Sequence, residues 1–202
     1  MIIHKPLHRF LILLSIIVLA GCTGTSPNAS FYTLSPLESG DIRGQSTKKP
    51  GKIAIGIGPV TFPDQLDRPA IVTKTGKNQV IINEFQRWAG SLQRDFTRVM
   101  TQNLAVLLDT DQVMSRPWER YFKPDIRITV DVQHFSGQLG KTAELTATWM
   151  IIEEDSDSQT VVHRSEIKEA VADGSYEAFV AAQSRALANL CKEIAEALAA
   201  YK

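Results

Sequence analysis

The first 20 residues constrain this chain more than any other feature, because a short basic start leads into a compact apolar run. Lys5 and Arg9 precede residues 10–20, which read FLILLSIIVLA and hold a single serine. A helix needs about 20 apolar residues to cross the hydrocarbon core of a bilayer, so this run is too short for a stable span. The pattern is typical of a secretory signal peptide. We therefore expect residues 1–21 to be removed and exclude them from the fold.

Cys22 stands directly after this run, in the sequence Leu19-Ala20-Gly21-Cys22. The sequence resembles a bacterial lipobox, in which the cysteine receives lipid and the chain is cut before it. The alternative is an ordinary secretory signal with a free Cys22, which leaves the joint placement of the apolar run, Gly21 and Cys22 unexplained. In lipoproteins, a residue such as Thr23 in place of aspartate favours transfer to the outer membrane. Several acyl chains together make attachment effectively permanent.

The rest of the chain has the composition of one globular domain behind a short tether. Hydrophobic residues make up 44% of the sequence, and 22 basic side chains balance 22 acidic ones. The composition argues against disorder, and the lack of net charge argues against a nucleic-acid partner. Residues 22–30 are small and polar, as in a flexible tether, and residues 31–202 are expected to form a single domain. With Cys22 lipidated, Cys191 is expected to be a buried thiol on a helix.

Apolar residues that alternate with polar or small ones predict most of the strands. A short aromatic segment at residues 31–34 predicts the first strand, and the polar residues 35–51 predict a long surface loop. Thr75-Gly76-Lys77-Asn78 separates two β-prone segments and predicts a hairpin. The predicted strands after the first are residues 52–60, 70–74, 79–82, 126–133, 145–151 and 160–171.

Two segments change to helical periodicity. From Leu92 to Leu108 the apolar residues recur every three or four positions, and a similar stripe follows Asp173-Gly174-Ser175 to the end of the chain. Polar Gln183 and Ser184 interrupt the second stripe. Neither helix alternates with strands in a βαβ order. We therefore predict an α+β fold, a mainly antiparallel sheet with two amphipathic helices packed on one face.

The sequence offers no catalytic or metal-binding constellation. His134 and His163 are the histidines that follow the leader, and neither has a metal-ligand neighbour at a familiar spacing. Both are expected on strand surfaces. Ser175 lacks the flanking glycines of a nucleophile elbow and is better explained as a helix cap. We expect no catalytic residue, no metal and no cofactor.

The middle of the chain carries a family resemblance. Residues 66–72 read LDRPAIV and residues 85–89 read FQRWA. With the lipobox, the early FYTL segment and the SRAL segment of the last helix, their order resembles the PqiC-type auxiliary lipoproteins of ABC-type and mammalian-cell-entry (MCE) transport systems. Where that family has Glu-Pro, this chain has Gly90-Ser91. The exact start of the helix near Ser91 is therefore left open.

The resemblance implies a non-enzymatic lipoprotein anchored in the outer membrane and facing the periplasm. Such a protein would bind an envelope-spanning MCE-domain partner, support lipid transport and membrane integrity, and leave room for a homo-oligomer. An anchored small-ligand carrier and an anchored hydrolase with an unrecognised site are the alternatives.

The candidate partner-binding residues are Arg68, Pro69, Arg87 and Trp88, because arginine and tryptophan are favoured at interfaces. The predicted hairpin should bring the two pairs together. The alternative is purely structural, with Trp88 in the core, Arg87 solvated beside it and residues 67–69 forming a rigid loop.

Overall fold

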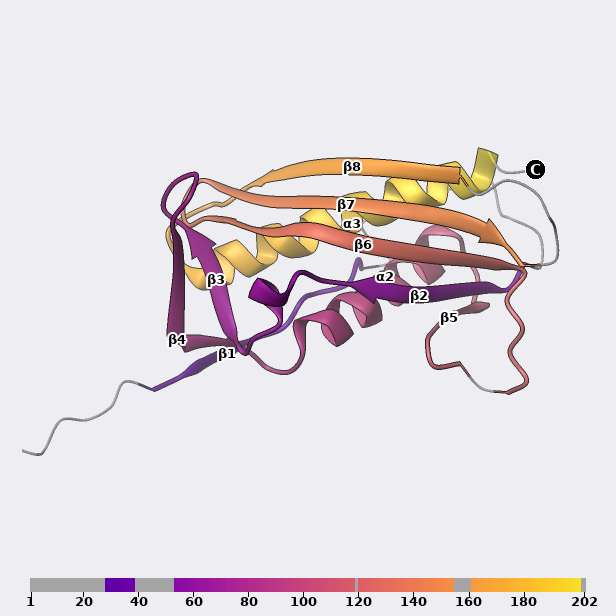
Figure 1. Cartoon of the computed structure of the whole chain (residues 1–202), viewed down its shortest axis with the longest axis horizontal. Coiled ribbons are helices and arrows are strands. Elements are labelled where there is room, and N and C mark those ends of the chain that lie inside the picture. The colour runs from indigo at the N-terminus through magenta and orange to yellow at the C-terminus, as the bar shows by residue number, and fades with distance from the viewer. Residues whose placement is uncertain (1–27, 39–52, 119, 155–160, 201–202) are drawn as a thin grey trace, which may run out of the picture.

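A five-stranded sheet covered on one face by two helices forms the body of the molecule (Figure 1). The structure is a computed structural model and describes residues 28–38, 53–118, 120–154 and 161–200. The order across the large sheet is β5-β2-β6-β7-β8. Its strands are β2 (Ile55–Thr61), β5 (Val113–Ser115), β6 (Ile126–Gln138), β7 (Thr142–Glu153) and β8 (Val161–Ala170).

The antiparallel meander β6-β7-β8 follows from the alternation in the sequence. Along β7, Leu145, Ala147, Trp149 and Ile151 are buried, while the residues between them are partly exposed. Val130 lies opposite Trp149 in the β6–β7 register, so the apolar faces of adjacent strands coincide. The predicted strands at residues 126–133, 145–151 and 160–171 are confirmed.

The expected α+β class is confirmed, but the large sheet is mixed because β2 pairs in parallel with both β5 and β6. The chain leaves β2, forms a hairpin, passes through a helix and returns as β5. This is a parallel crossover, and the expectation that no helix connects parallel strands was wrong. In β2, Gly58 has a φ of 121°, a conformation that favours glycine.

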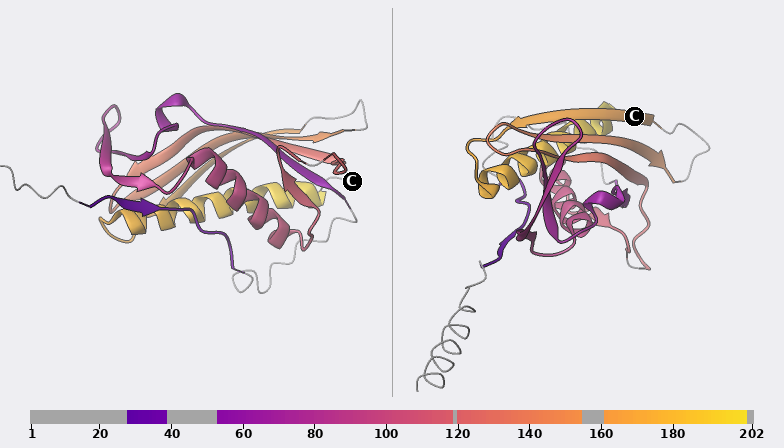
Figure 2. Two further views of the ribbon diagram at one scale, coloured as in Figure 1. Left: turned by 90° about the horizontal axis from the view of Figure 1, so that it is seen from below. Right: turned by 60° about the vertical axis from the view of Figure 1, so that its left-hand side comes forward.

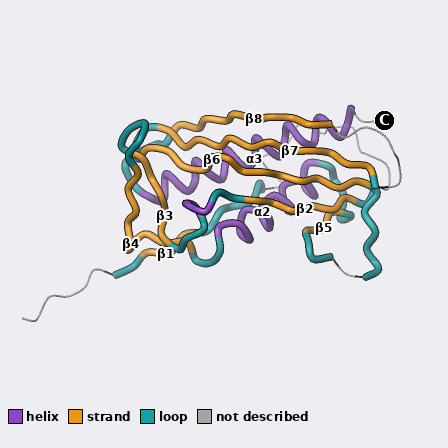
Figure 3. The backbone as a smooth tube through the Cα atoms, in the orientation of Figure 1, coloured by secondary structure: helices purple, strands orange, loops and turns teal. Residues whose placement is uncertain are grey.

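A separate three-stranded sheet closes one end of the molecule, where the sequence had suggested a single sheet (Figure 3). Its order is β1-β4-β3. The short 3-10 helix η2 (Asp64–Leu66) lies between β2 and β3 in the chain. β3 and β4 form the predicted antiparallel hairpin, and β1 pairs in parallel with the far end of β4. The strands are β1 (Ser30–Tyr32), β3 (Ala70–Lys74) and β4 (Val80–Trp88).

Both helices lie on the same face of the large sheet (Figure 2). Helix α2 (Leu92–Leu107) begins after Ser91, whose side chain accepts a hydrogen bond from the backbone of Arg94 at 3.4 Å. Ser91 therefore caps the helix without the proline of the family pattern. Helix α3 (Tyr176–Ala200) begins after Ser175, whose Oγ accepts from the backbone of Ala178.

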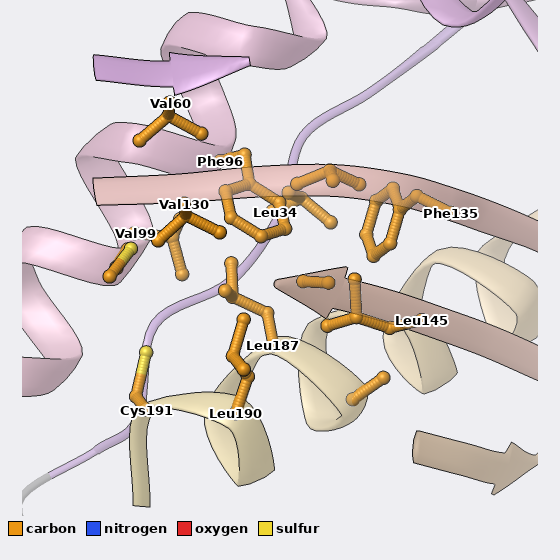
Figure 4. Packing of buried hydrophobic residues seen from close by; sticks show 14 of the residues in the cluster. Leu34, Val60, Phe96, Val99, Val130, Phe135, Leu145, Leu187, Leu190 and Cys191 are labelled. Atoms are coloured by element: carbon orange, nitrogen blue, oxygen red, sulfur yellow. The ribbon is translucent and has the colours of Figure 1, made fainter. Parts of the chain in front are cut away.

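The core fills the layer between sheet and helices (Figure 4). Phe96 of α2 packs edge to face on Phe135 of β6, with ring centroids 5.4 Å apart. Phe62 packs on Phe96 in the same way, with ring centroids 5.2 Å apart. Leu187 and Leu190 of α3 complete the layer below β7.

The segment after β1 is fixed to the helices by polar side chains. The Asp95 carboxylate accepts the backbone N–H of Leu34 at 2.7 Å, the Ser184 hydroxyl accepts that of Ser35 at 3.1 Å, and Asn103 accepts that of Leu37 at 2.7 Å. Leu34 is itself buried. The polar Ser184 that interrupted the apolar stripe therefore holds the start of the domain against α3.

Candidate functional site

The structure brings three of the four predicted partner-binding residues to one surface at the base of the hairpin. Arg68 and Pro69 are exposed immediately before β3, and Arg87 is half-buried in β4. The carbonyl of Pro69 accepts a hydrogen bond from the backbone of Trp88 at 2.8 Å. The hairpin thus folds back as expected and places the two sequence motifs side by side.

Trp88 does not contribute its side chain to that surface. It is 5% exposed and belongs to the hydrophobic core. β1 covers this end of β4, with Tyr32 opposite Trp88 in the register. Trp88 therefore has the alternative role considered for it, that of a core tryptophan. The candidate binding surface is reduced to Arg68, Pro69 and Arg87.

The two cysteines have different settings. Cys22 lies outside the described residues. Cys191 is fully buried on α3, and burial raises the pKa of its thiol to about 12, although Asn103 beside it acts in the opposite direction. Cys191 is therefore the packing residue that the sequence predicted, since a neutral buried thiol is a poor nucleophile.

The two histidines lie on β6 and β8, strands of the large sheet that β7 separates, and they do not form a metal site together. His163 is exposed on β8 and stacks on Trp149, with ring centroids 4.4 Å apart. His134 is half-buried on β6, and its ring lies 3.2 Å from the Lys74 ammonium and 3.5 Å from the Glu144 carboxylate. Burial, with the Lys74 charge next in size, lowers the pKa of His134 below 6.5 despite Glu144.

A groove of about 680 Å³ runs between β2, α2 and β5 on the helix side of the sheet. Ile57, Pro59, Val60 and Pro117 give it apolar walls. Uncharged polar side chains also line it, namely Gln93, Thr97, Thr101, Gln102 and Ser115. Its size is within the usual range for ligand sites, and its lining combines apolar and hydrogen-bonding groups.

Three arginines give this groove a positive charge. Arg94 and Arg98 come from α2 and Arg116 from the segment after β5, and the lining contains no acidic residue. Arg98 already pairs with Asp95 and donates to the Leu34 carbonyl at 3.0 Å. Arg116 lies over the Trp118 ring at 4.9 Å. Within the described part of the chain, neither Arg94 nor Arg116 forms an ion pair, so both can meet an anionic group.

Sequence reasoning missed this groove. Arg94 and Arg116 are 22 positions apart and belong to elements whose contact depends on the parallel β2–β5 pairing. The available signal was weak. Gly58-Pro59 and Arg116-Pro117, both cis peptide bonds, lie side by side where the paired strands β2 and β5 end their common register, and an Xaa-Pro pair in the sequence does not indicate which segment lies beside it.

The described residues contain no group of three or more His, Cys, Asp or Glu side chains able to hold a metal ion. Within the same residues, no helix has both the length and the apolar character needed to cross a membrane.

Comparisons with known proteins agree with this fold. The intermembrane transport lipoprotein PqiC of Escherichia coli is 25% identical over 143 residues, which cover 71% of this chain and 73% of PqiC. The PqiC of Shigella flexneri gives the same figures.

Two solved structures share the architecture. A protein described as uncharacterised has a TM-score of 0.69 at 19% identity, covering 85% of this chain and 99% of its own. A Xanthomonas campestris protein has a TM-score of 0.65 at 13% identity, covering 83% and 93%. At these identities the likeness concerns the fold alone. The family model for the ABC-type transport auxiliary lipoprotein component matches residues 32–195, and the chain therefore belongs to that family.

Proposed function

We propose that this protein is a non-enzymatic auxiliary component of an intermembrane lipid transport system. It is lipidated at Cys22, held in the outer membrane with its domain in the periplasm, and bound to an envelope-spanning MCE-domain partner, and it thereby supports membrane integrity. The tether ends before Ser30, which is the first residue of β1 and therefore belongs to the domain. The observation that carries the proposal is the family match over residues 32–195 in a chain that opens with a lipobox.

The contacts that fix the first residues of the domain to the helices support an anchoring role. A tether transmits position only when the segment that follows it is fixed to the fold. Here Leu34 is buried and its backbone is held from both sides, by the Asp95 carboxylate on the N–H and the Arg98 guanidinium on the carbonyl. Charge-assisted hydrogen bonds of this kind are stronger than neutral ones.

Two surfaces support a binding role. The arginine groove offers Arg94 and Arg116 to an acidic segment of the partner, and the hairpin base offers Arg68 beside Pro69 and Arg87. Arginine is favoured at interfaces because its planar fork binds carboxylates bidentately. We assign the groove to the partner as the main contact, since it has depth, apolar walls and unpaired charge together.

The anchor is tested by a Cys22→Ser substitution in the full chain. We expect loss of fatty-acid incorporation and loss of outer-membrane fractionation, with the domain still folded. A Cys22→Ser protein that still incorporates labelled fatty acid overturns the lipobox assignment.

The partner contact is tested by charge reversal at Arg94 and Arg116, followed by purification with native partners. We expect Arg94→Glu and Arg116→Glu to weaken recovery of the MCE-domain protein, while Lys141→Glu, at the exposed β6–β7 turn, leaves it unchanged. Arg68→Glu tests the hairpin base in the same assay. Recovery that is equal for all four variants and wild type excludes both surfaces.

A small-ligand carrier is a second candidate, favoured by the volume of the groove and by its arginines, which suit an anionic amphiphile. Native mass spectrometry of the purified protein separates the two roles. A stoichiometric lipid that Arg94→Glu removes supports the carrier, whereas lipid-free protein that binds the partner supports assembly.

A further inference from the structure

The exposed apolar side chains gather at one end of the molecule. Of the eight large hydrophobic residues exposed in the described part of the chain, five belong to β1 and β4. Phe31 is 63% exposed and Ile82, the least exposed of the five, 39%. The five are Phe31, Val80, Ile81, Ile82 and Phe85, which we name the hairpin patch.

Both faces of β4 contribute to this patch. Val80, Ile81 and Ile82 are consecutive, so neighbouring side chains point to opposite faces of the strand, yet all three are exposed. β3 occupies one edge of β4, while β1 occupies the other edge only at residues 86–88. Residues 80–85 therefore present apolar side chains on two faces beside an open edge, an arrangement that soluble proteins usually avoid.

The hairpin patch lies at the end of the fold where the chain from Cys22 arrives. Phe31 lies opposite Arg87 in the register, so β1 joins the patch at the end of β4 away from the hairpin turn (Figure 1). Ser30 at the start of β1 is eight positions after Cys22. At about 3.6 Å per residue, a fully extended tether reaches roughly 29 Å.

We propose that the hairpin patch rests in the interfacial layer of the lipid bilayer and orients the domain on the membrane. The inference rests on the lipidation of Cys22 proposed above. Because a short tether joins this end of the molecule to a cysteine held in the bilayer, this end stays close to the lipid surface. Apolar side chains on both faces of one strand are enclosed by fluid acyl chains more completely than by a flat protein surface.

The charges around the patch fit this location. Lys77 is exposed at the hairpin turn, where its long side chain can extend to anionic headgroups. Glu84, the acidic residue of β4, is exposed between Ile82 and Phe85 and does not add to this attraction. The turn itself, residues 75–79, is polar. The hairpin therefore lies along the interface with its turn among the headgroups and its apolar side chains below them.

The experiment places a polarity-sensitive dye on the patch of the lipidated protein. Cys22 is occupied by lipid and Cys191 is buried with a pKa raised to about 12, so the new cysteine in Ile81→Cys is the reactive one. Val162→Cys on β8, 59% exposed, is the matched control, and Phe31→Cys is a second position on the patch. The proteins are reconstituted in vesicles of phosphatidylethanolamine and phosphatidylglycerol.

The expected result is a blue-shifted emission at positions 81 and 31 that brominated acyl chains quench, with a water-like, unquenched signal at position 162. A water-like signal at 81 and 31 in protein that floats with the vesicles overturns this inference alone. Failure of the wild-type protein to float overturns the anchor and this inference with it. A blue shift in vesicle-free Cys22→Ser protein that grows with protein concentration assigns the patch to a second copy and also overturns it.

Discussion

At the scale of the residue, Cys191 gives the sharpest test, because complete burial raises the pKa of its thiol to about 12. The unfolded thiol loses its proton near pH 9, so between that pH and 12 the folded state holds one more proton than the unfolded state. Its contribution to stability is thus present below pH 9 and lost as pH rises towards 12, by about 1.4 kcal/mol per pH unit.

We expect the free energy of unfolding to fall more steeply above pH 9 in the wild type than in Cys191→Ala, measured by urea titration. We also expect thiol reagents to modify Cys191 only when the protein unfolds. Equal slopes in the two proteins, or rapid modification of the folded protein, contradict the packing role.

Trp88 is the candidate partner-binding residue that the structure places in the core. Because its side chain is 5% exposed and packs in the hydrophobic core, Trp88→Ala should lower the free energy of unfolding by about 3–5 kcal/mol. Arg68→Glu next to it is exposed and should change that free energy by under about 0.5 kcal/mol. Urea unfolding of both variants checks the pair. A Trp88→Ala protein of wild-type stability would restore Trp88 to the candidate interface.

Local chemistry made some residues predictable and others not. Ser175 was recognisable as a cap because the helical period starts directly after it. The role of Asn103 was not predictable from the sequence. The backbone N–H of Leu37, whose hydrogen bond it accepts, is 66 positions away and comes close only when the first strand crosses the helices. The same distance problem hid the arginine groove.

At the scale of the element, the start of α2 is the clearest case. Ser91 caps the helix through a hydrogen bond to the Arg94 backbone, so Ser91→Ala should lower the free energy of unfolding by about 1 kcal/mol. Ser91→Asp keeps an acceptor at the positive end of the helix dipole and should retain wild-type stability. Thermal unfolding of the two variants measures the difference. A loss of equal size in both would show that the Ser91 side chain acts in another way.

The elements themselves were largely predictable where one period runs for eight or more residues, as in β6, β7 and both helices. The hairpin turn at residues 75–78 was predictable from its glycine. The parallel pairing of β2 was not, because β5 has three residues, too few to show a period. The inserted hairpin also separates β2 from α2, which conceals the strand-helix-strand order.

At the scale of the whole molecule, a polar contact between two side chains links the hairpin to the large sheet. The Lys74 ammonium at the end of β3 lies 3.2 Å from the His134 ring on β6. Burial and the Lys74 charge lower the pKa of His134 below 6.5. As pH falls below 6.5, the unfolded chain therefore takes up a proton before the folded one does. The stability from neutral His134 is present above pH 6.5 and lost as pH falls through its lowered pKa.

Protonation of His134 places a second positive charge beside Lys74, so acid should loosen the hairpin before the meander. We expect hydrogen exchange in β3 and β4 to rise between about pH 7.5 and about pH 5 by more than exchange in β7, after correction for the intrinsic pH dependence of exchange. His134→Gln should remove that excess, because glutamine stays neutral. His163→Gln, which alters the exposed ring stacked on Trp149, should leave it intact and controls for general acid effects on the carboxylates. An excess that survives in His134→Gln would show that another group, and not His134, makes the hairpin sensitive to acid.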